Sequence, residues 1–149
     1  MNEDLDSKFS ISTDKSQLDL SMIHNFLKTS YWAKDIQKFI VEKSIANSLC
    51  FGVYQKEQQI GFARVISDYT TFAYLADVFI LESYRGQGLG KWLIKSILEH
   101  SELQNLRKFL LGTRDAHELY RQFGFNNLNR PELYMEITNR DLYDPLADE

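Results

Sequence analysis

The stretch ESYRGQGLGKWL, residues 82–93, places three of the seven glycines of the chain within five positions and then becomes apolar. Glycine inside a helix costs up to about 1 kcal/mol relative to alanine, so this cluster needs a reason. The first amides of a helix have no partners within it and carry the positive end of its dipole. With Arg85 and Lys91 beside them, such amides could bind a pyrophosphate. The alternative is a turn that needs glycine only for positive φ.

Two familiar phosphate-binding motifs do not fit this spacing. The dinucleotide motif G-x-G-x-x-G, started at Gly86, ends on Lys91, and its other possible start ends on a leucine. The P-loop G-x-x-x-x-G-K-[ST] fits Gly90 and Lys91, but it meets Arg85 where it needs glycine and Trp92 where it needs a hydroxyl. The loop therefore predicts a phosphate site of another kind.

Other residues could supply acid-base or binding chemistry. Asp77 lies within the apolar run 71–81, where a charged carboxylate is costly unless it is paired or faces a cleft. It could accept a proton from an amine, or it could form an ion pair with Arg64. Arg64 could instead bind a substrate carboxylate. Tyr31 and Trp32 could hold a cation against their rings or could simply pack between helices.

No metal centre or nucleophilic cysteine is expected. Cys50 is the only cysteine, which excludes an internal disulfide, and no basic partner stands near it in the sequence. His24 and His100 fall on expected helices without a carboxylate or cysteine cluster around them. His117 is interpreted as a solvated or capping group.

The hydrophobic pattern predicts the elements that would position these residues. Residues 9–13 alternate as a short strand, and a helical period follows Asp19. A second helix is expected from about Asp35, with one face formed by Ile36, Phe39 and Ile40. Residues 48–55 and 60–67 flank the polar turn KEQQ and predict a hairpin.

The second half alternates strands and helices. The run 71–81 suits a central strand buried on both faces, and a helix is expected from Leu89. A buried strand over 107–113, a short helix over 115–122 and a last strand over 132–138 complete the order. This order predicts one α+β domain over residues 1–149, with a mixed, mostly antiparallel central sheet flanked by helices in a sandwich. The tail from about 139 to 149 is expected to be mobile.

Composition narrows the class of protein. The chain has 149 residues, 44% of them hydrophobic and 26% charged, as expected for a globular domain. The net charge of −4 argues against nucleic acid or an anionic membrane surface as partner. No run approaches the roughly 20 apolar residues that span a bilayer, and the start MNEDLDSKF shows no signal peptide. We expect a cytoplasmic protein.

Two motifs resemble a known family. Arg85, Gly88 and Gly90 occupy the defining positions of [RQ]-x-x-G-x-[GA], the signature of the GNAT superfamily of acetyl-CoA-dependent N-acyltransferases. Further on, AHELYRQFGF (116–125) resembles the late A-x-x-L-Y-x-x-x-G-F segment of that superfamily. The resemblance is strongest over about 49–125. Two positions depart from it: Thr113 replaces a common asparagine, and Glu82 replaces a common proline.

The resemblance implies the GNAT fold and N-acetyl transfer from acetyl-CoA to a primary amine by direct attack. The main chain of the central strand would bind the pantetheine arm, and the glycine loop would bind the pyrophosphate. The residues concerned are Val78, Phe79 and Ile80 for the arm, and Arg85, Gly86, Gln87, Gly88, Leu89, Gly90 and Lys91 for the pyrophosphate.

The resemblance also implies roles around the reacting atoms. Tyr120 matches the tyrosine that acts as general acid toward the CoA thiolate, and Asp77 lies on the strand where several members place a base. The acceptor pocket would involve Tyr31, Trp32, Arg64 and Tyr74, with Phe62 as a further contributor. The acceptor, a small-molecule or protein amine, is not specified by any residue. Homodimers are frequent among relatives. A non-catalytic CoA-binding sensor or scaffold is the alternative function.

Overall fold

The structure is a computed structural model, and it describes residues 3–144. The tail expected to be mobile from about residue 139 is described only as far as Asp144, and residues 145–149 lie outside the described part. The short helix α1 (Glu3–Lys8), which the hydrophobic pattern did not indicate, precedes the first strand.

One mixed sheet forms the centre of the domain. It contains the strands β1 (Ser10–Ser12), β2 (Leu49–Gln55), β3 (Gln58–Ser67), β4 (Phe72–Ile80) and β5 (Lys108–Leu111), in that spatial order. The first four strands pair antiparallel, whereas β5 runs parallel to β4. The expected mixed, mostly antiparallel sheet is confirmed.

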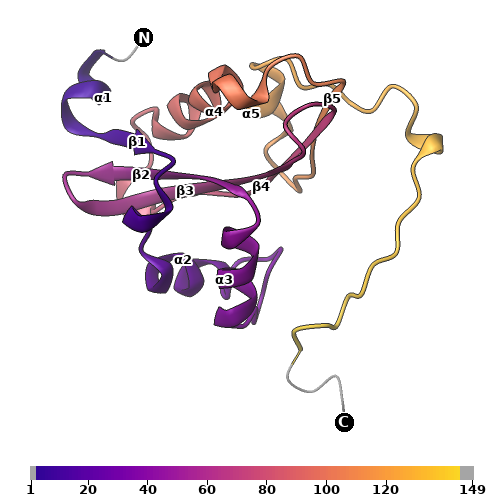
Figure 1. The fold of residues 1–149 in the computed structure, drawn as a ribbon, viewed down its shortest axis with the longest axis horizontal. Helices are drawn as coiled ribbons and strands as arrows, with labels where there is room; N and C mark the ends of the chain where they lie inside the picture. Colours follow the sequence, from indigo (N-terminus) through magenta and orange to yellow (C-terminus); the bar gives the residue numbers. More distant parts are fainter. Residues whose placement is uncertain (1–2, 145–149) are drawn as a thin grey trace.

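Helices cover both faces of the sheet, so the domain has three layers (Figure 1). On one face, α2 (Leu20–Leu27) and α3 (Lys38–Ala46) enclose a core that includes Cys50, Phe62 and Phe79. On the other face, α4 (Leu89–Glu99) and α5 (His117–Arg121) cover a larger core. Amphipathic helices bury their apolar stripes in this way against a two-sided sheet.

The second helix begins later than expected. Asp19 caps α2 by accepting a hydrogen bond from the Met22 amide at 3.0 Å, as its position before the helical period indicated. Asp35, however, has a positive φ of 65°, a conformation that a helix interior excludes. The helix α3 therefore starts at Lys38, and Phe39 is exposed rather than part of its buried face.

The expected last strand is wrong for this structure. Residues 131–133 form one 3-10 turn, and residues 134–139 have no regular structure. Figure 1 shows this segment in yellow, leading away from the sheet. Alternating apolar residues favour a strand only where a neighbouring strand pairs with it.

Strands β4 and β5 separate halfway along β4. Their pairing extends only from Phe72 and Lys108 to Leu75 and Leu111. Beyond that point β4 continues to Ile80 without a parallel partner. On its other side, the register with β3 shifts between Phe62 and Arg64. Asp77 lies at this irregularity with a positive φ of 56°, so a bulge redirects its side chain.

Candidate active site

A cleft of about 610 Å³ opens where β4 and β5 separate. Its walls come from the loop between α2 and α3, from β3 and β4, and from the segment between β5 and α5. Seven of the residues singled out in the sequence line it together: Tyr31, Trp32, Arg64, Tyr74, Asp77, Val78 and Tyr120. Phe62, the further contributor, is fully buried in the core and does not line the cleft.

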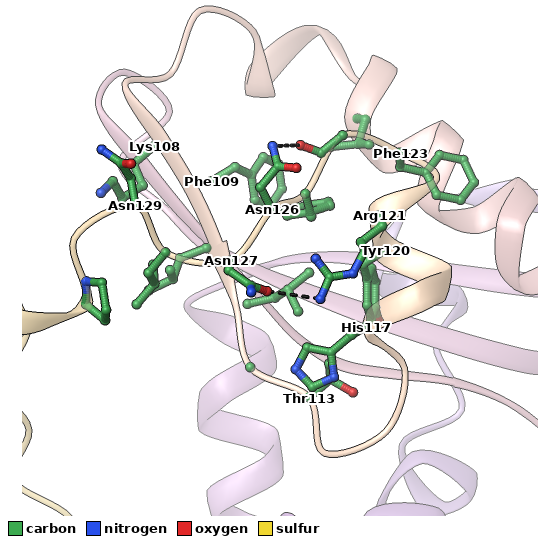
Figure 2. Close-up of a pocket in the computed structure, with 18 residues that line it drawn as sticks. Lys108, Phe109, Thr113, His117, Tyr120, Arg121, Phe123, Asn126, Asn127 and Asn129 are labelled. Carbon is green, nitrogen blue, oxygen red and sulfur yellow. Dashed lines mark hydrogen bonds between the residues drawn. The ribbon is translucent and has the colours of Figure 1, made fainter.

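Tyr120 stands on α5, where it lines both this cleft and the neighbouring pocket that Figure 2 shows from close by. It is only 8% exposed, and its ring packs edge-on against Phe125 at 5.8 Å between centroids. Burial, with a smaller effect of Tyr31, raises the pKa of Tyr120 to about 12. The phenol therefore stays protonated at neutral pH and is available as a hydrogen-bond donor.

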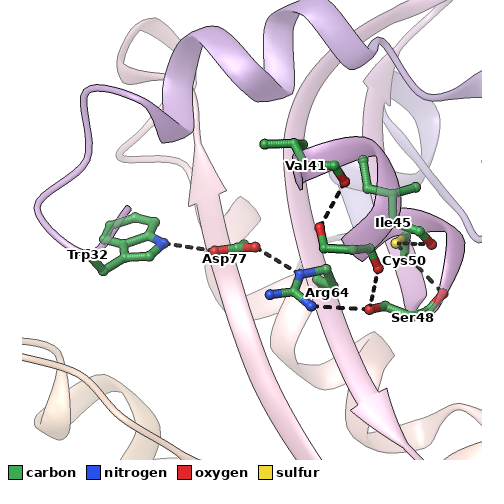
Figure 3. A network of polar contacts seen from close by, with 8 residues as sticks. Trp32, Val41, Ile45, Ser48, Cys50, Arg64 and Asp77 are labelled. Atoms are coloured by element: carbon green, nitrogen blue, oxygen red, sulfur yellow. Dashed lines mark hydrogen bonds and ion pairs between the residues drawn. The ribbon is translucent and has the colours of Figure 1, made fainter. Parts of the chain in front are cut away.

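Asp77 connects two walls of the cleft (Figure 3). Its Oδ1 accepts a hydrogen bond from Trp32 Nε1 at 2.8 Å, and its Oδ2 accepts one from Arg64 Nε at 2.9 Å. The side chains of Arg64 and Asp77 are only 16% and 10% exposed. Both carboxylate oxygens therefore already have donors, and the carboxylate fixes an indole on one side and a guanidinium on the other.

The network extends into α3 through Ser48, a residue that the sequence analysis missed. Arg64 Nη1 donates to Ser48 Oγ at 3.1 Å, and Ser48 Oγ donates to the Ser44 carbonyl at 2.6 Å. This chain of bonds holds the Arg64 guanidinium from two directions. A serine before a strand carries no sequence signal for such a contact, because its partner is 16 residues away.

The aromatic pair lines the wall of the cleft that the loop between α2 and α3 forms. Tyr31 and Trp32 are exposed, with their rings edge to face at 5.1 Å, so they are not core residues between helices. The guanidinium of Arg114 already lies over the Tyr31 ring, 3.8 Å from its centroid, in a cation–π contact. The Arg114 amide also donates to the Tyr31 hydroxyl at 3.1 Å. Arg114, which no sequence pattern indicated, lines the cleft from the segment before α5.

Thr113, which replaces the common asparagine of the family, has a structural role here. Its Oγ1 accepts a hydrogen bond from the Ala116 amide at 3.1 Å, immediately before α5. The hydroxyl therefore satisfies an amide at the start of the helix that carries Tyr120. Tyr143, from the C-terminal segment, is the other unexpected residue in the lining.

The glycine loop leads from the end of β4 into α4. Gly86 and Gly88 have positive φ values of 85° and 87°, and Gly88 is the N-cap. Because glycine has no side chain to cap the helix, the first amides of α4 keep no partner among the described residues. These amides belong to Leu89, Gly90 and Lys91.

Gly90 distinguishes between the two explanations of the glycine loop, which are phosphate binding and a turn that needs glycine only for positive φ. It has no positive φ, and a Cβ atom placed there would meet nothing within 4 Å. Neither the backbone nor packing therefore requires glycine at this position, and alanine would favour the helix. Positive φ explains Gly86 and Gly88 only. The open space at Gly90 is compatible with close approach of a ligand to the helix start.

Two polar side chains shape the loop. Arg85 Nε donates to the Ile80 carbonyl at 2.9 Å, and Gln87 Nε2 donates to the Tyr84 carbonyl at 3.0 Å. Leu89 is buried, so only its amide is available to a ligand, whereas Lys91 is exposed. The loop thus presents main-chain donors and positive charge on one side and is anchored to the core on the other.

The strand between the loop and the cleft has a free edge. Val78 lines the cleft, Phe79 stacks on Phe26 at 3.8 Å, and Ile80 is buried. Because β5 has diverged, the main chain of this stretch has no strand partner on that side within residues 3–144. Such an edge can accept the amide groups of an extended ligand.

Within residues 3–144, no group of three or more His, Cys, Asp or Glu could hold a metal ion. Cys50 is buried, and burial raises the pKa of its thiol to about 11, so a thiolate nucleophile is disfavoured. His24 Nε2 contacts the Ile36 carbonyl at 2.9 Å, a structural role.

The sequence and the fold both match known proteins. Residues 18–125 match the sequence model of the Acetyltransferase (GNAT) family. The chain belongs to the GNAT acetyltransferase family. It is therefore an acyltransferase by family, and the resemblance carried by the two motifs is confirmed.

Individual GNAT relatives agree with this assignment. A Gibberella zeae protein named as a candidate acetyltransferase is 30% identical over 131 residues, which cover 74% of each chain. The crystal structure of a candidate GNAT acetyltransferase from Xanthomonas campestris pv. campestris is 47% identical, with a TM-score of 0.89, over 91% of this chain and 96% of that one.

A more distant GNAT structure, from Elizabethkingia anophelis with acetyl-CoA bound, is 15% identical with a TM-score of 0.63. It covers 89% of this chain and 90% of that one, and this likeness concerns the fold alone. In the described part of the present GNAT chain, no helix has the length and apolar character needed to cross a bilayer.

Proposed function

We propose that this protein transfers an acetyl group from acetyl-CoA to a primary amine. The observation that carries the proposal is the arrangement along β4: unpartnered helix amides at one end, a free strand edge in the middle, and a cleft with a protonated tyrosine at the other. The acetyl-CoA in the related Elizabethkingia structure supports the same co-substrate.

The co-substrate would lie along this path. Its pyrophosphate would accept hydrogen bonds from the amides of Leu89, Gly90 and Lys91, with the α4 dipole favouring the negative charge. The pantetheine arm would pair with the main chain of Val78, Phe79 and Ile80, in the place left by β5. The thioester would then reach the cleft beside Tyr120.

Direct attack needs a neutral amine and a leaving thiolate that accepts a proton. The amine nitrogen forms a bond to the thioester carbonyl carbon, and the C–S bond breaks. Tyr120 donates a hydrogen bond to the sulfur as negative charge builds up there. Since a phenol with pKa near 12 is a weaker acid than a thiol, the proton moves only as the C–S bond breaks.

Asp77 could serve this reaction in two ways. As a base, it would take the proton released from the amine, directly or through water. As a positioning group, it would hold Trp32 and Arg64 in the acceptor wall, and the proton released from the amine would pass to water. Its two existing hydrogen bonds support the second role, because both oxygens already accept from donors. The two roles predict different kinetics for Asp77→Asn.

The acceptor wall favours an amine that can lie beside aromatic rings. Tyr31, Trp32 and Tyr74 line it, while Arg64 and Arg114 contribute positive charge that is partly used by Asp77 and Tyr31. A neutral amine, the form that attacks, is compatible with this environment. The proposed acceptor is an amine of a small molecule or of a protein.

The proposal is tested with the purified protein, acetyl-CoA and a panel of amines, amino acids and aminoglycosides. A ligand at 100 times its dissociation constant stabilises the fold by about 2.7 kcal/mol, so acetyl-CoA should raise the melting temperature while ATP and NAD should not. Thiol release should depend on an amine. Binding without turnover of any amine would instead favour a CoA-binding sensor, and no stabilisation by CoA would contradict the proposal.

A further inference from the structure

The charged groups of the cleft between β4 and β5 differ in how far the protein itself uses them. Of the described residues that line it, four are charged: Arg64, Asp77, Arg114 and Asp115. Each oxygen of Asp77 already accepts a hydrogen bond, one from Trp32 Nε1 at 2.8 Å and one from Arg64 Nε at 2.9 Å. The Asp115 side chain is 68% exposed, and its carboxylate lies 3.9 Å from Arg114 Nη2, too far for a hydrogen bond. Among these lining residues, no buried carboxylate therefore has an oxygen free of a donor for a cationic ligand.

The guanidinium of Arg64 has a donor nitrogen that the protein does not use. Arginine has five N–H groups, and here Nε binds Asp77 while Nη1 binds Ser48. Nη2 makes no hydrogen bond to any described residue, and no dashed line leaves it in Figure 3. Within residues 3–144, the one buried polar side-chain atom without a partner is Tyr54 Oη, so Arg64 Nη2 is open to the cleft that its side chain lines.

Arg114 is a cation of the cleft that has no hydrogen-bonded carboxylate among the described residues. Its guanidinium lies over the Tyr31 ring, 3.8 Å from the centroid, and its amide donates to the Tyr31 hydroxyl at 3.1 Å. Tyr31 therefore holds both the side chain and the main chain of Arg114. A stacked guanidinium keeps the N–H groups at its edge, where a carboxylate can accept two parallel hydrogen bonds. Because the side chain is 65% exposed, this edge is accessible to a ligand.

Aromatic and aliphatic side chains cover the wall beside these donors. Arg114 lies over Tyr31, and the Tyr31 ring in turn meets the Trp32 ring edge to face at 5.1 Å. Tyr31 and Trp32 are 48% and 42% exposed, so both rings offer surface to a ligand. Further apolar or aromatic side chains in the lining are Ile36, Ile40 and Tyr74. A ligand that fits this wall has an apolar or aromatic body and an anionic end.

We propose that the acceptor is an amino carboxylate with an apolar or aromatic body. Arg114 binds its carboxylate, and Arg64 Nη2 supplies a further donor. The body lies against Tyr31 and Trp32, and the amine reaches the thioester beside Tyr120. The products are an N-acetylated amino carboxylate and CoA. This acceptor rests on the proposed acetyl transfer and narrows it. Polyamines and aminoglycosides are poor acceptors, because their additional positive charges would face Arg114.

The first test compares amines that differ only in the carboxylate. Turnover of acetyl-CoA is measured at one pH with phenylalanine and phenethylamine, with tryptophan and tryptamine, and with leucine and isoamylamine, and spermidine serves as a polycation. We expect kcat/KM to be about tenfold higher or more for the carboxylate member of at least one pair, because a charge-assisted contact to arginine contributes about that factor. Equal or higher values for the plain amine in every pair, or a preference for spermidine, would overturn the proposed acceptor while leaving acetyl transfer intact.

Variants of Arg114 test its part in this preference. Arg114→Met keeps a long side chain but removes the charge, and it should abolish the preference for the carboxylate member. Arg114→Lys keeps the charge without the planar fork and should retain part of the preference. Arg107→Met is the matched control, since Arg107 is exposed outside the cleft, and it should behave as the wild type. An unchanged preference in Arg114→Met would contradict the role of Arg114.

The second test measures binding, which does not depend on turnover. The N-acetylated forms of the same three pairs are titrated calorimetrically into the protein in the presence of CoA. In at least one pair, the carboxylate member should bind the wild type about tenfold more tightly than its partner, and the two should bind Arg114→Met equally. This result without turnover of any amine would contradict acetyl transfer but support the carboxylate site. If the carboxylate gives no tighter binding to the wild type in any pair, the proposed acceptor is wrong whether or not acetyl transfer occurs.

Discussion

Arg64 and Asp77 lie on neighbouring strands and are joined by a 2.9 Å ion pair that is largely shielded from water. A bulge with positive φ at Asp77 makes the pair possible, because it turns the carboxylate toward Arg64 and Trp32 at the same time. Residues with strained backbone are retained where the surrounding structure fixes them. The pair therefore helps to fix the wall of the cleft that we propose binds the acceptor.

Replacing Asp77 by asparagine should distinguish its two roles. Loss of the charge leaves Arg64 without its partner and should destabilise the fold by about 1–3 kcal/mol, measured by urea unfolding. If Asp77 positions the wall, the variant should raise KM for the amine with a modest change in kcat. If Asp77 is the base, kcat should fall about 100-fold or more. Trp32→Phe, which removes the indole N–H that binds Asp77 but keeps a smaller aromatic ring, is the comparison.

Replacing Tyr120 by phenylalanine should slow turnover while leaving co-substrate binding intact. General acid catalysis contributes roughly 100-fold to 10,000-fold, so kcat should fall within that range while the dissociation constant of acetyl-CoA changes little. Stopped-flow turnover and calorimetric titration measure the two quantities. An unchanged kcat at saturating substrates would remove Tyr120 from the mechanism.

The buried phenol also predicts how stability depends on pH. Its pKa is about 12 in the folded protein and about 10 in the unfolded chain, so the folded state holds the proton more tightly. That contribution is complete below pH 10 and is lost as the pH rises toward 12, by about 2–3 kcal/mol. Denaturant unfolding of the wild type should show this decline, and Tyr120→Phe should show a smaller one. Equal declines would mean that burial does not hold the proton on Tyr120.

Replacing Gly90 by alanine should separate stability from binding. Alanine in the first turn of α4 should stabilise the fold by up to about 1 kcal/mol, because the site has space and an ordinary backbone. The added methyl group should nevertheless weaken acetyl-CoA binding about tenfold or more, by keeping the phosphates from the amides. Glu99→Ala, at the other end of the helix, is the control and should leave binding unchanged. Unchanged acetyl-CoA affinity in Gly90→Ala would mean that the loop is only a turn and does not bind the phosphates.

Replacing Tyr31 tests the acceptor wall. Tyr31→Phe keeps the ring beneath Arg114 but removes the hydroxyl that accepts the Arg114 amide. Tyr31→Ala removes both contacts. We expect KM for the amine to change more in the alanine variant, by several-fold, with acetyl-CoA affinity preserved in both. Steady-state kinetics with each substrate varied in turn measures the difference, and an effect on acetyl-CoA alone would contradict the assignment.

Much of the fold could be predicted because its signals are local. The hairpin 48–67, the central strand and the helix after the glycine loop all follow from hydrophobic period and turn residues. The start of α3 was misplaced because only the backbone at Asp35 shows that the helix cannot begin there. The strand over 132–138 was expected from alternation alone, whereas pairing depends on a partner that no local pattern specifies.

The residues of the candidate site likewise fall into those that a local sequence pattern predicts and those that it does not. Motif residues such as Tyr120 and the glycine loop could be found because their spacing along the chain is fixed. Ser48 and Arg114 could not, because each acts through a contact that only the folded sheet creates, to Arg64 and to Tyr31. Asp77 was noticed for its position in an apolar strand, but the bulge that aims it has no sequence signature.

Following a labelled acetyl group tests whether the protein transfers it from acetyl-CoA to an amine. The wild type and Tyr120→Phe are incubated with acetyl-CoA labelled in the acetyl carbons and with the amine panel, and the products are analysed by mass spectrometry. We expect one labelled acetamide per CoA released, formed much faster by the wild type. Release of CoA without labelled amide, or equal rates for the two proteins, would contradict this expectation.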